Sequence, residues 1–164
     1  MMKKDLTMLE ILGTAIRAEI ESFKLYKKIA SKVSNSIVKD KFNALAKEEK
    51  SHRTMLEELY RKKAGKTKLI VPQKSLKAKH LAVDVAQSSY EEILKLAIKK
   101  EKEARAFYLE ASKKATDRSG KFILQYLADF ERNHQKTLEQ ELKALTDYPM
   151  WWDSEGPGIQ FIGP

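Results

Sequence analysis

Two glutamate–histidine pairs with the same spacing are the residues of this sequence most suited to binding metal. Glu49 and His52 lie in EEKSHRT, and Glu131 and His134 lie in FERNHQK. Residues three positions apart in a helix project from the same side about one turn apart, so such a pair can bind one ion. A single pair of this kind arises often by chance in charged helices. A second copy requires another explanation.

Both pairs belong to an internal repeat, which appears when the sequence is shifted by 82 residues. EILGTAIRAEIESFKLY then aligns with EILKLAIKKEKEARAFY, and the register holds without an insertion up to the second pair. A glutamate and a tyrosine recur in these two stretches: Glu19 aligns with Glu101, and Tyr26 aligns with Tyr108. Each repeat therefore carries a glutamate thirty residues before a Glu-x-x-His pair, which chance does not explain.

The periodicity of apolar residues predicts an all-α fold that positions these side chains. Intervals of three and four residues between apolar positions indicate amphipathic helices over four segments. We expect them at residues 7–32, 35 or 36–63, 89–116 and 119–145, with Ser88 or Ser89 capping the third. The fold class is thus a four-helix bundle built from two repeated helical hairpins.

A linker of about twenty-five residues, 65–89, separates the two hairpins. A chain of this length reaches easily along a bundle roughly 30 Å long, so we expect a crossover that lets the second and third helices run parallel. The apolar stretch LIVP, residues 69–72, should attach the crossover to the bundle. SLKAKHLAV, residues 75–83, is predicted to form a short helix.

Composition restricts the classes of protein to which the chain can belong. It has 164 residues, of which 42% are hydrophobic and 34% charged, with six Gly and four Pro, which fits one helix-rich domain. The absence of Cys excludes disulfides, thiolate catalysis and cysteine-ligated iron. No signal peptide and no apolar run of membrane-spanning length is found, so we expect a cytoplasmic protein without membrane partners. The net charge of +9 is spread along the chain among 23 acidic residues, which favours solvated helix faces over a nucleic-acid footprint.

The repeated glutamates interrupt apolar faces, which argues against a surface merely inherited by duplication. Glu19 shares its helical face with Ile16 and Phe23, and Glu131 shares its own with Leu127 and Leu138. A buried carboxylate without a partner costs several kcal/mol, and four in one core layer would also repel each other. Two divalent cations would offset this charge directly.

One glutamate from each of two helices, with Glu-x-x-His from each of the other two, is the ligand set of a dinuclear carboxylate site in a four-helix bundle. We expect Glu49 and Glu131 to bridge two metal ions, with Glu19 and Glu101 as terminal ligands. The remaining two ligands are the histidines, one for each metal: His52 and His134. Nitrogen and carboxylate donors without sulfur suit Fe(II), with Mn(II) as the alternative.

Three further residues have candidate roles around this site. Tyr26 and Tyr108 each follow a terminal glutamate by two helical turns, and either pack as core aromatics or donate a hydrogen bond to a ligand carboxylate. Glu48, four residues before His52, could orient that ring. The second repeat has Phe130 at the matching position, which weakens this interpretation.

The six ligand positions, both tyrosines and the duplication resemble the rubrerythrin group of the ferritin-like superfamily over residues 7–145. The resemblance implies two iron ions that reduce hydrogen peroxide to water, or that oxidise Fe(II) with dioxygen or peroxide. Full-length rubrerythrins carry a rubredoxin-like domain with four cysteines, so this Cys-free chain would need an external electron donor, either another protein or a small reductant. They also carry another carboxylate one turn from the third-helix glutamate, where this chain has Ile98 and Ala104.

This departure weakens the peroxidase interpretation and keeps ferroxidase chemistry open. Two other ferritin-like classes fit less well: quinone-precursor hydroxylases need apolar membrane-surface helices, whereas mean hydropathy here is −0.54, and mini-ferritins use an intersubunit site with other ligands. A basic helical nucleic-acid-binding protein with a vestigial metal site is the non-enzyme alternative.

We expect residues 1–147 to form the bundle and residues 148–164 to form a non-helical tail. The tail sequence, PMWWDSEGPGIQFIGP after Tyr148, is too rich in Pro and Gly for a helix and too apolar for a free segment. We therefore expect it to pack on the bundle or on a neighbouring subunit. A homodimer or larger homo-oligomer is the corresponding expectation for assembly.

Overall fold

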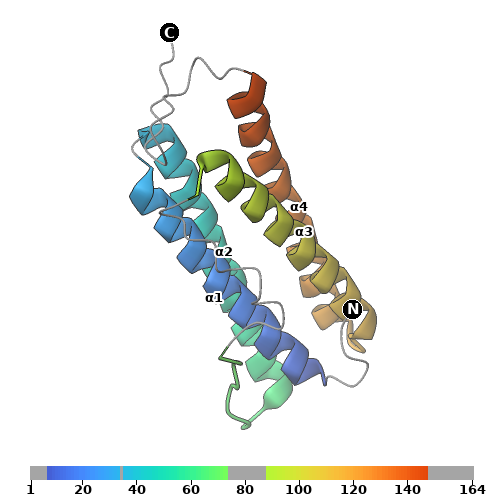
Figure 1. Ribbon diagram of the computed structural model, residues 1–164. Coiled ribbons are helices and arrows are strands. Elements are labelled where there is room, and N and C mark those ends of the chain that lie inside the picture. Colours follow the sequence, from blue (N-terminus) through green and yellow to red (C-terminus); the bar gives the residue numbers. More distant parts are fainter. Residues whose placement is uncertain (1–6, 34, 74–87, 148–164) are drawn as a thin grey trace.

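The computed structural model describes residues 7–33, 35–73 and 88–147. These residues contain four helices and form an all-α four-helix bundle, as predicted (Figure 1). The helices are α1 (Met8–Lys32), α2 (Ser36–Ala64), α3 (Tyr90–Lys114) and α4 (Arg118–Asp147). The ends of all four helices lie within two residues of the predicted positions. The predicted C-terminal tail and the predicted short helix SLKAKHLAV lie outside the described residues.

The helices form two antiparallel hairpins, α1 with α2 and α3 with α4 (Figure 1). The hairpins meet through contacts of α1 with α3 and of α2 with α4. Both α2 and α3 run downward in the view of Figure 1, so they are parallel, as the long linker predicts. In this topology one helix from each hairpin faces its repeat equivalent across the centre of the bundle.

The two repeats begin their first helices with the same local device. Thr7 and Glu10 form a capping box at the start of α1, and Ser89 and Glu92 form one at the start of α3. The glutamate side chain accepts from the backbone N–H of the cap residue at 2.7 Å in the first box and 2.8 Å in the second. Caps of this kind stabilise a helix by about 1 kcal/mol and fix the residue at which it begins. The duplication therefore extends to the signals that set the register of the site helices.

The start of the linker packs against α1, as predicted for LIVP. Leu69 and Val71 pack on the apolar cluster around Leu12 and Leu56. The backbone carbonyl of Ile70 lies so close to Gly13 that a Cβ at this position would clash with it. Gly13 thus gives the linker room to approach the helix backbone.

Apolar side chains form two clusters, one toward each end of the bundle. One contains Phe42 and Leu94, and the other contains Leu12 and Leu127. The candidate ligands on every helix lie between the residues contributed to these two clusters. The fold therefore places a polar layer between two apolar layers. Within the described part of the chain, no helix is long and apolar enough to cross a membrane.

Candidate metal centre

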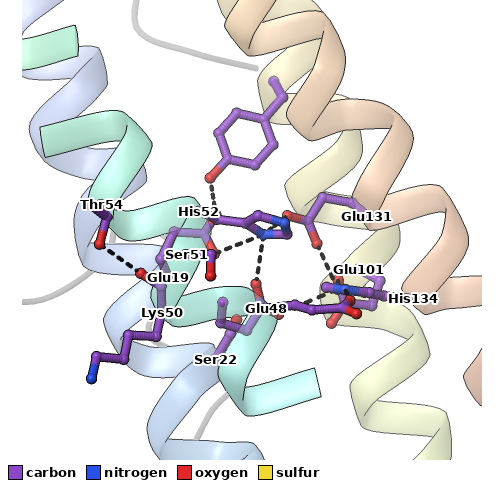
Figure 2. A network of polar contacts seen from close by, with 12 residues as sticks. Glu19, Ser22, Glu48, Lys50, Ser51, His52, Thr54, Glu101, Glu131 and His134 are labelled. Atoms are coloured by element: carbon purple, nitrogen blue, oxygen red, sulfur yellow. Dashed lines mark hydrogen bonds and ion pairs between the residues drawn. The ribbon is translucent and has the colours of Figure 1, made fainter. Parts of the chain in front are cut away.

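All six predicted ligands meet in the polar layer between the two apolar clusters. Figure 2 shows Glu19, His52, Glu101, Glu131 and His134 of this set turned toward one another. Each is almost fully buried, with at most 3% of its surface exposed. Their nitrogen and oxygen atoms form two groups, each with its atoms within 4.8 Å of one another: Glu19, Glu49, His52 and Glu131 in one, and Glu49, Glu101, Glu131 and His134 in the other. Because Glu49 and Glu131 belong to both groups, they are placed where bridging ligands would have to lie.

Both histidines turn the same ring atom toward the centre. The Nδ1 atom of His52 lies 3.1 Å from Glu49 Oε2, 3.6 Å from Glu131 Oε1 and 3.7 Å from Glu19 Oε2. The Nδ1 atom of His134 lies 3.5–3.7 Å from oxygens of three carboxylates: Glu49, Glu131 and Glu101. Two atoms that are each about 2.1 Å from one divalent ion lie roughly 3.0–3.6 Å apart at angles of ~90–120°. Five of these six separations are longer than a usual hydrogen bond and suit ligands that share an ion. The distance of 3.1 Å between His52 Nδ1 and Glu49 Oε2 fits both a hydrogen bond and a shared ion.

Several buried atoms of the site have no hydrogen-bond partner among the residues that the structure describes. They include Glu49 Oε1, Glu131 Oε1 and His134 Nδ1. Buried polar atoms are almost always paired in proteins, because an unpaired one costs about 1–3 kcal/mol. Two cations would satisfy all three atoms, one beside His134 that reaches its Nδ1 and Glu49 Oε1, and one beside His52 that reaches Glu131 Oε1. The donor set, four carboxylates and two imidazoles, fits a pair of divalent transition-metal ions such as iron or manganese.

In the absence of metal, the surroundings of the site shift the pKa values of neighbouring carboxyl groups in opposite directions. Burial, together with the charge of Glu49, raises the pKa of Glu19 to about 8. Burial would also raise the pKa of Glu49, but its contacts with His134 and His52 outweigh burial and hold it far below the usual range. Burial and the neighbouring Glu101 raise the pKa of Glu131 well above normal. Protons thus replace cations when the site is empty of metal.

The histidines are correspondingly drawn toward their charged forms. Burial opposes the charge on His52, but contacts with Glu19 and Glu49 outweigh burial and raise its pKa to about 9. The pKa of His134 is raised for the same reason by Glu101, Glu131 and Glu49. Metal binding would have to displace these protons, because ligands bind metal in the deprotonated form.

The two tyrosines donate hydrogen bonds to the terminal glutamates, but across the repeats. Tyr26 donates to Glu101, and Tyr108 donates to Glu19. Both tyrosines are buried. Tyr26 lies on the same helix as Glu19, which accepts from Tyr108, and Tyr108 lies on the same helix as Glu101, which accepts from Tyr26. Sequence spacing alone left packing and hydrogen bonding equally open, and the structure shows the hydrogen bond. Burial and the adjacent Glu19 raise the pKa of Tyr108, so its hydroxyl keeps the proton that it donates.

We predict that Tyr108→Phe lowers the free energy of unfolding of the metal-free protein by about 1–2 kcal/mol, because a buried carboxyl group loses its donor while the ring is kept. Urea unfolding at neutral pH would measure this change. Tyr126→Phe is the matched control, since Tyr126 is 41% exposed and its change should stay within about 0.5 kcal/mol. Equal effects of the two substitutions would show that the hydroxyl of Tyr108 contributes nothing.

Glu48 contacts a different histidine from the one that its sequence position suggested. Its Oε2 lies 2.6 Å from Nε2 of His134, on the opposite hairpin, and it does not orient His52. The ring of Phe130, its repeat equivalent, packs edge-on against His52 with centroids 5.1 Å apart. Both side chains therefore reach across the interface between α2 and α4. Helical spacing describes neighbours on one helix only, so it could not find these pairs.

The fold and the site define a four-helix bundle of the ferritin-like class with a carboxylate-rich centre for two metal ions. The chain belongs to the rubrerythrin family, whose model matches residues 10–142. The six repeated ligand positions of the sequence resemble those of this family, so the family predicted from the sequence is confirmed.

Solved structures agree with this assignment. The chain is similar to a hypothetical protein from Pyrococcus furiosus, with 30% identity and a TM-score of 0.74 over 88% of this chain and 93% of the other. It also shares its fold with a protein from Thermotoga maritima described as a ferritin-like diiron-carboxylate protein, at 18% identity and a TM-score of 0.72 over 87% of this chain and 98% of the other. No curated protein matches the sequence.

Proposed function

We propose that this protein is a di-iron oxidoreductase that reduces hydrogen peroxide to water with electrons from an external donor protein. The observation that carries the proposal is the single buried site formed by six side chains from both repeats, with unpaired nitrogen and oxygen atoms facing its centre. The reaction consumes one peroxide, two electrons and two protons and yields two water molecules. Two bound ferrous ions would supply the two electrons that break the O–O bond.

The residues of the chain would hold and neutralise the charged centre. Glu49 and Glu131 touch both halves of the site and would keep the two ions together. Glu19 and Glu101 would each complete one half, held in place by the tyrosine of the other repeat. This cross-pairing ties α1 to α3, so a shift of one hairpin would disturb both halves.

Exclusion of bulk water also follows from the surroundings of the site. The hydroxyl groups of Tyr26 and Tyr108 keep their protons and donate hydrogen bonds to the terminal glutamates inside the site, so these carboxylates are not left to bind water. The two apolar clusters close the polar layer from both ends of the bundle. A site that is dry and rigid strengthens the interactions of its carboxylates with bound cations.

Ferroxidase activity is the second candidate, and the residues around Glu101 favour it. Ile98 and Ala104 stand one turn either side of Glu101, where the rubrerythrin pattern has a further carboxylate. With six ligands instead of seven, the chain would oxidise Fe(II) as a substrate, with dioxygen or peroxide as the oxidant.

The surface gives less support to nucleic-acid binding. Several basic side chains along the helices pair with acids one turn away, as in Arg17–Glu21, Arg53–Glu57 and Lys95–Glu91. Such pairs are typical of solvated helix faces and leave fewer cations to contact phosphates.

We also propose that the protein is cytoplasmic and forms a homodimer or a larger homo-oligomer.

Stopped-flow spectroscopy separates the two redox candidates. Protein loaded anaerobically with two Fe(II) per chain is mixed with one equivalent of hydrogen peroxide or, in parallel, with dioxygen, and near-ultraviolet absorbance is followed. The proposal predicts far faster oxidation by peroxide. Equal or faster oxidation by dioxygen would replace peroxide reduction by ferroxidase activity.

A further inference from the structure

The two halves of the metal centre have the same ligands but different outer neighbours. Each half contains both shared glutamates, one terminal glutamate with its tyrosine, and one histidine. Outside this set, Glu48 Oε2 lies 2.6 Å from Nε2 of His134. At the repeat-equivalent place, Nε2 of His52 has no hydrogen-bond partner in the described part of the chain, and the ring of Phe130 packs edge-on against the imidazole.

This difference acts on the ring atom that faces the metal. A carboxylate accepts hydrogen bonds, so the contact with Glu48 places the hydrogen of His134 on Nε2 and leaves the Nδ1 lone pair directed into the centre. It also fixes the orientation of the ring and makes Nδ1 a stronger donor. Phe130 restricts the ring of His52 by packing alone and provides no acceptor. The His52 half therefore lacks a support that the His134 half has.

We propose that Glu48 is a positioning residue that makes the half containing His134 bind its metal ion more tightly, so that the two ions bind in two distinct steps. The proposal rests on the dinuclear centre of the proposed function but not on peroxide as its substrate. Outer carboxylate partners of a ligating histidine typically change metal affinity by about 10–100-fold. We expect the two steps of the natural protein to differ by a factor in this range.

The positions of Glu48 and Phe130 make the proposal testable without disrupting the core. The Glu48 side chain is 49% exposed, and Phe130 lies outside both buried clusters. Substitutions at these positions leave all six ligands in place. The duplication also provides a matched exchange, because Phe130→Glu offers the His52 half the carboxylate that it lacks.

The experiment is an anaerobic titration of the full chain with Co(II), followed by its visible d–d absorbance and by calorimetry. We expect Glu48→Ala to weaken the tighter step by about 10–100-fold and to bring the two steps together. Phe130→Glu should strengthen the weaker step. Glu48→Gln, which keeps an acceptor but removes the charge, should fall between the natural protein and Glu48→Ala.

The half that Glu48 acts on is identified by double substitution. Glu48→Ala should have no further effect on binding in a His134→Ala background and its full effect in a His52→Ala background. Two equal steps in the natural protein, an equal effect on both steps, or an effect that persists in His134→Ala would overturn the proposal, as would failure to bind two Co(II). Two-step binding without peroxide reduction would instead contradict the proposed function and leave this inference standing.

Discussion

Glu49→Ala is expected to abolish binding of two iron ions per chain and, with it, rapid oxidation by peroxide. Glu49 contacts both histidines and belongs to both ligand groups, so its removal takes an oxygen from each half of the site. We expect at most one ion to bind, and more weakly by at least about 100-fold, since loss of a direct ligand should exceed the effect of an outer partner. Metal analysis after anaerobic loading and desalting would measure the stoichiometry.

Glu58→Ala is the matched control for this substitution. Glu58 is an exposed carboxylate on the same helix, α2, so its loss changes the net charge equally without touching the centre. It should bind two irons like the natural protein. Helix content measured by circular dichroism should be unchanged in both variants. If Glu49→Ala still binds two ions, Glu49 is not a bridging ligand and the assigned centre is wrong.

The metal-free protein is expected to lose stability as pH rises, whereas the metal-loaded protein is not. Burial raises the pKa of Glu19 in the folded chain from its ordinary 4.5 to about 8, and contacts with Glu19 and Glu49 raise the pKa of His52 from its ordinary 6.5 to about 9. Between the ordinary and the raised values, the folded state holds more protons than the unfolded state, so the free energy of unfolding falls with pH. For Glu19 this window runs from about pH 4.5 to 8, and for His52 from about 6.5 to 9.

Thermal unfolding at pH 6 and at pH 8.5, with and without metal, would measure this effect. We expect a fall in Tm of roughly 2–4 °C for each kcal/mol lost in a domain of this size when metal is absent. Bound metal replaces the protons and stabilises by about 4 kcal/mol at a thousandfold excess over Kd, so loading should raise Tm more at pH 8.5 than at pH 6. A metal-free Tm that is constant or rises over this interval would show that the buried groups do not hold these protons.

The repeat made the bundle predictable from sequence, together with the six side chains that meet in its polar layer. Helical periodicity gave the helices, and the shift that aligns Glu49 with Glu131 also aligned every other ligand position. The start of α3 followed from a short-range signal, because Ser89 forms the cap that its sequence position suggested. Thr7, the first residue of the expected first helix, caps α1 in the same way.

Contacts between the hairpins could not be predicted, because they depend on how α1 meets α3 and α2 meets α4. Spacing placed Tyr26 near the site but could not show that it donates to Glu101 of the other repeat. The same limitation assigned Glu48 to His52 on its own helix, whereas it contacts His134 across the bundle. Sequence periodicity determines which face of a helix is buried, and only the packing of the helices determines which residue it meets.

We expect the six side chains to hold two iron ions between them. X-ray diffraction from crystals loaded anaerobically with Fe(II), collected on both sides of the iron absorption edge, would locate these ions. Two anomalous peaks are expected in the polar layer, one between Glu19 and His52 and the other between Glu101 and His134, with Glu49 and Glu131 next to both. A single peak, or iron bound only elsewhere on the chain, would contradict this expectation.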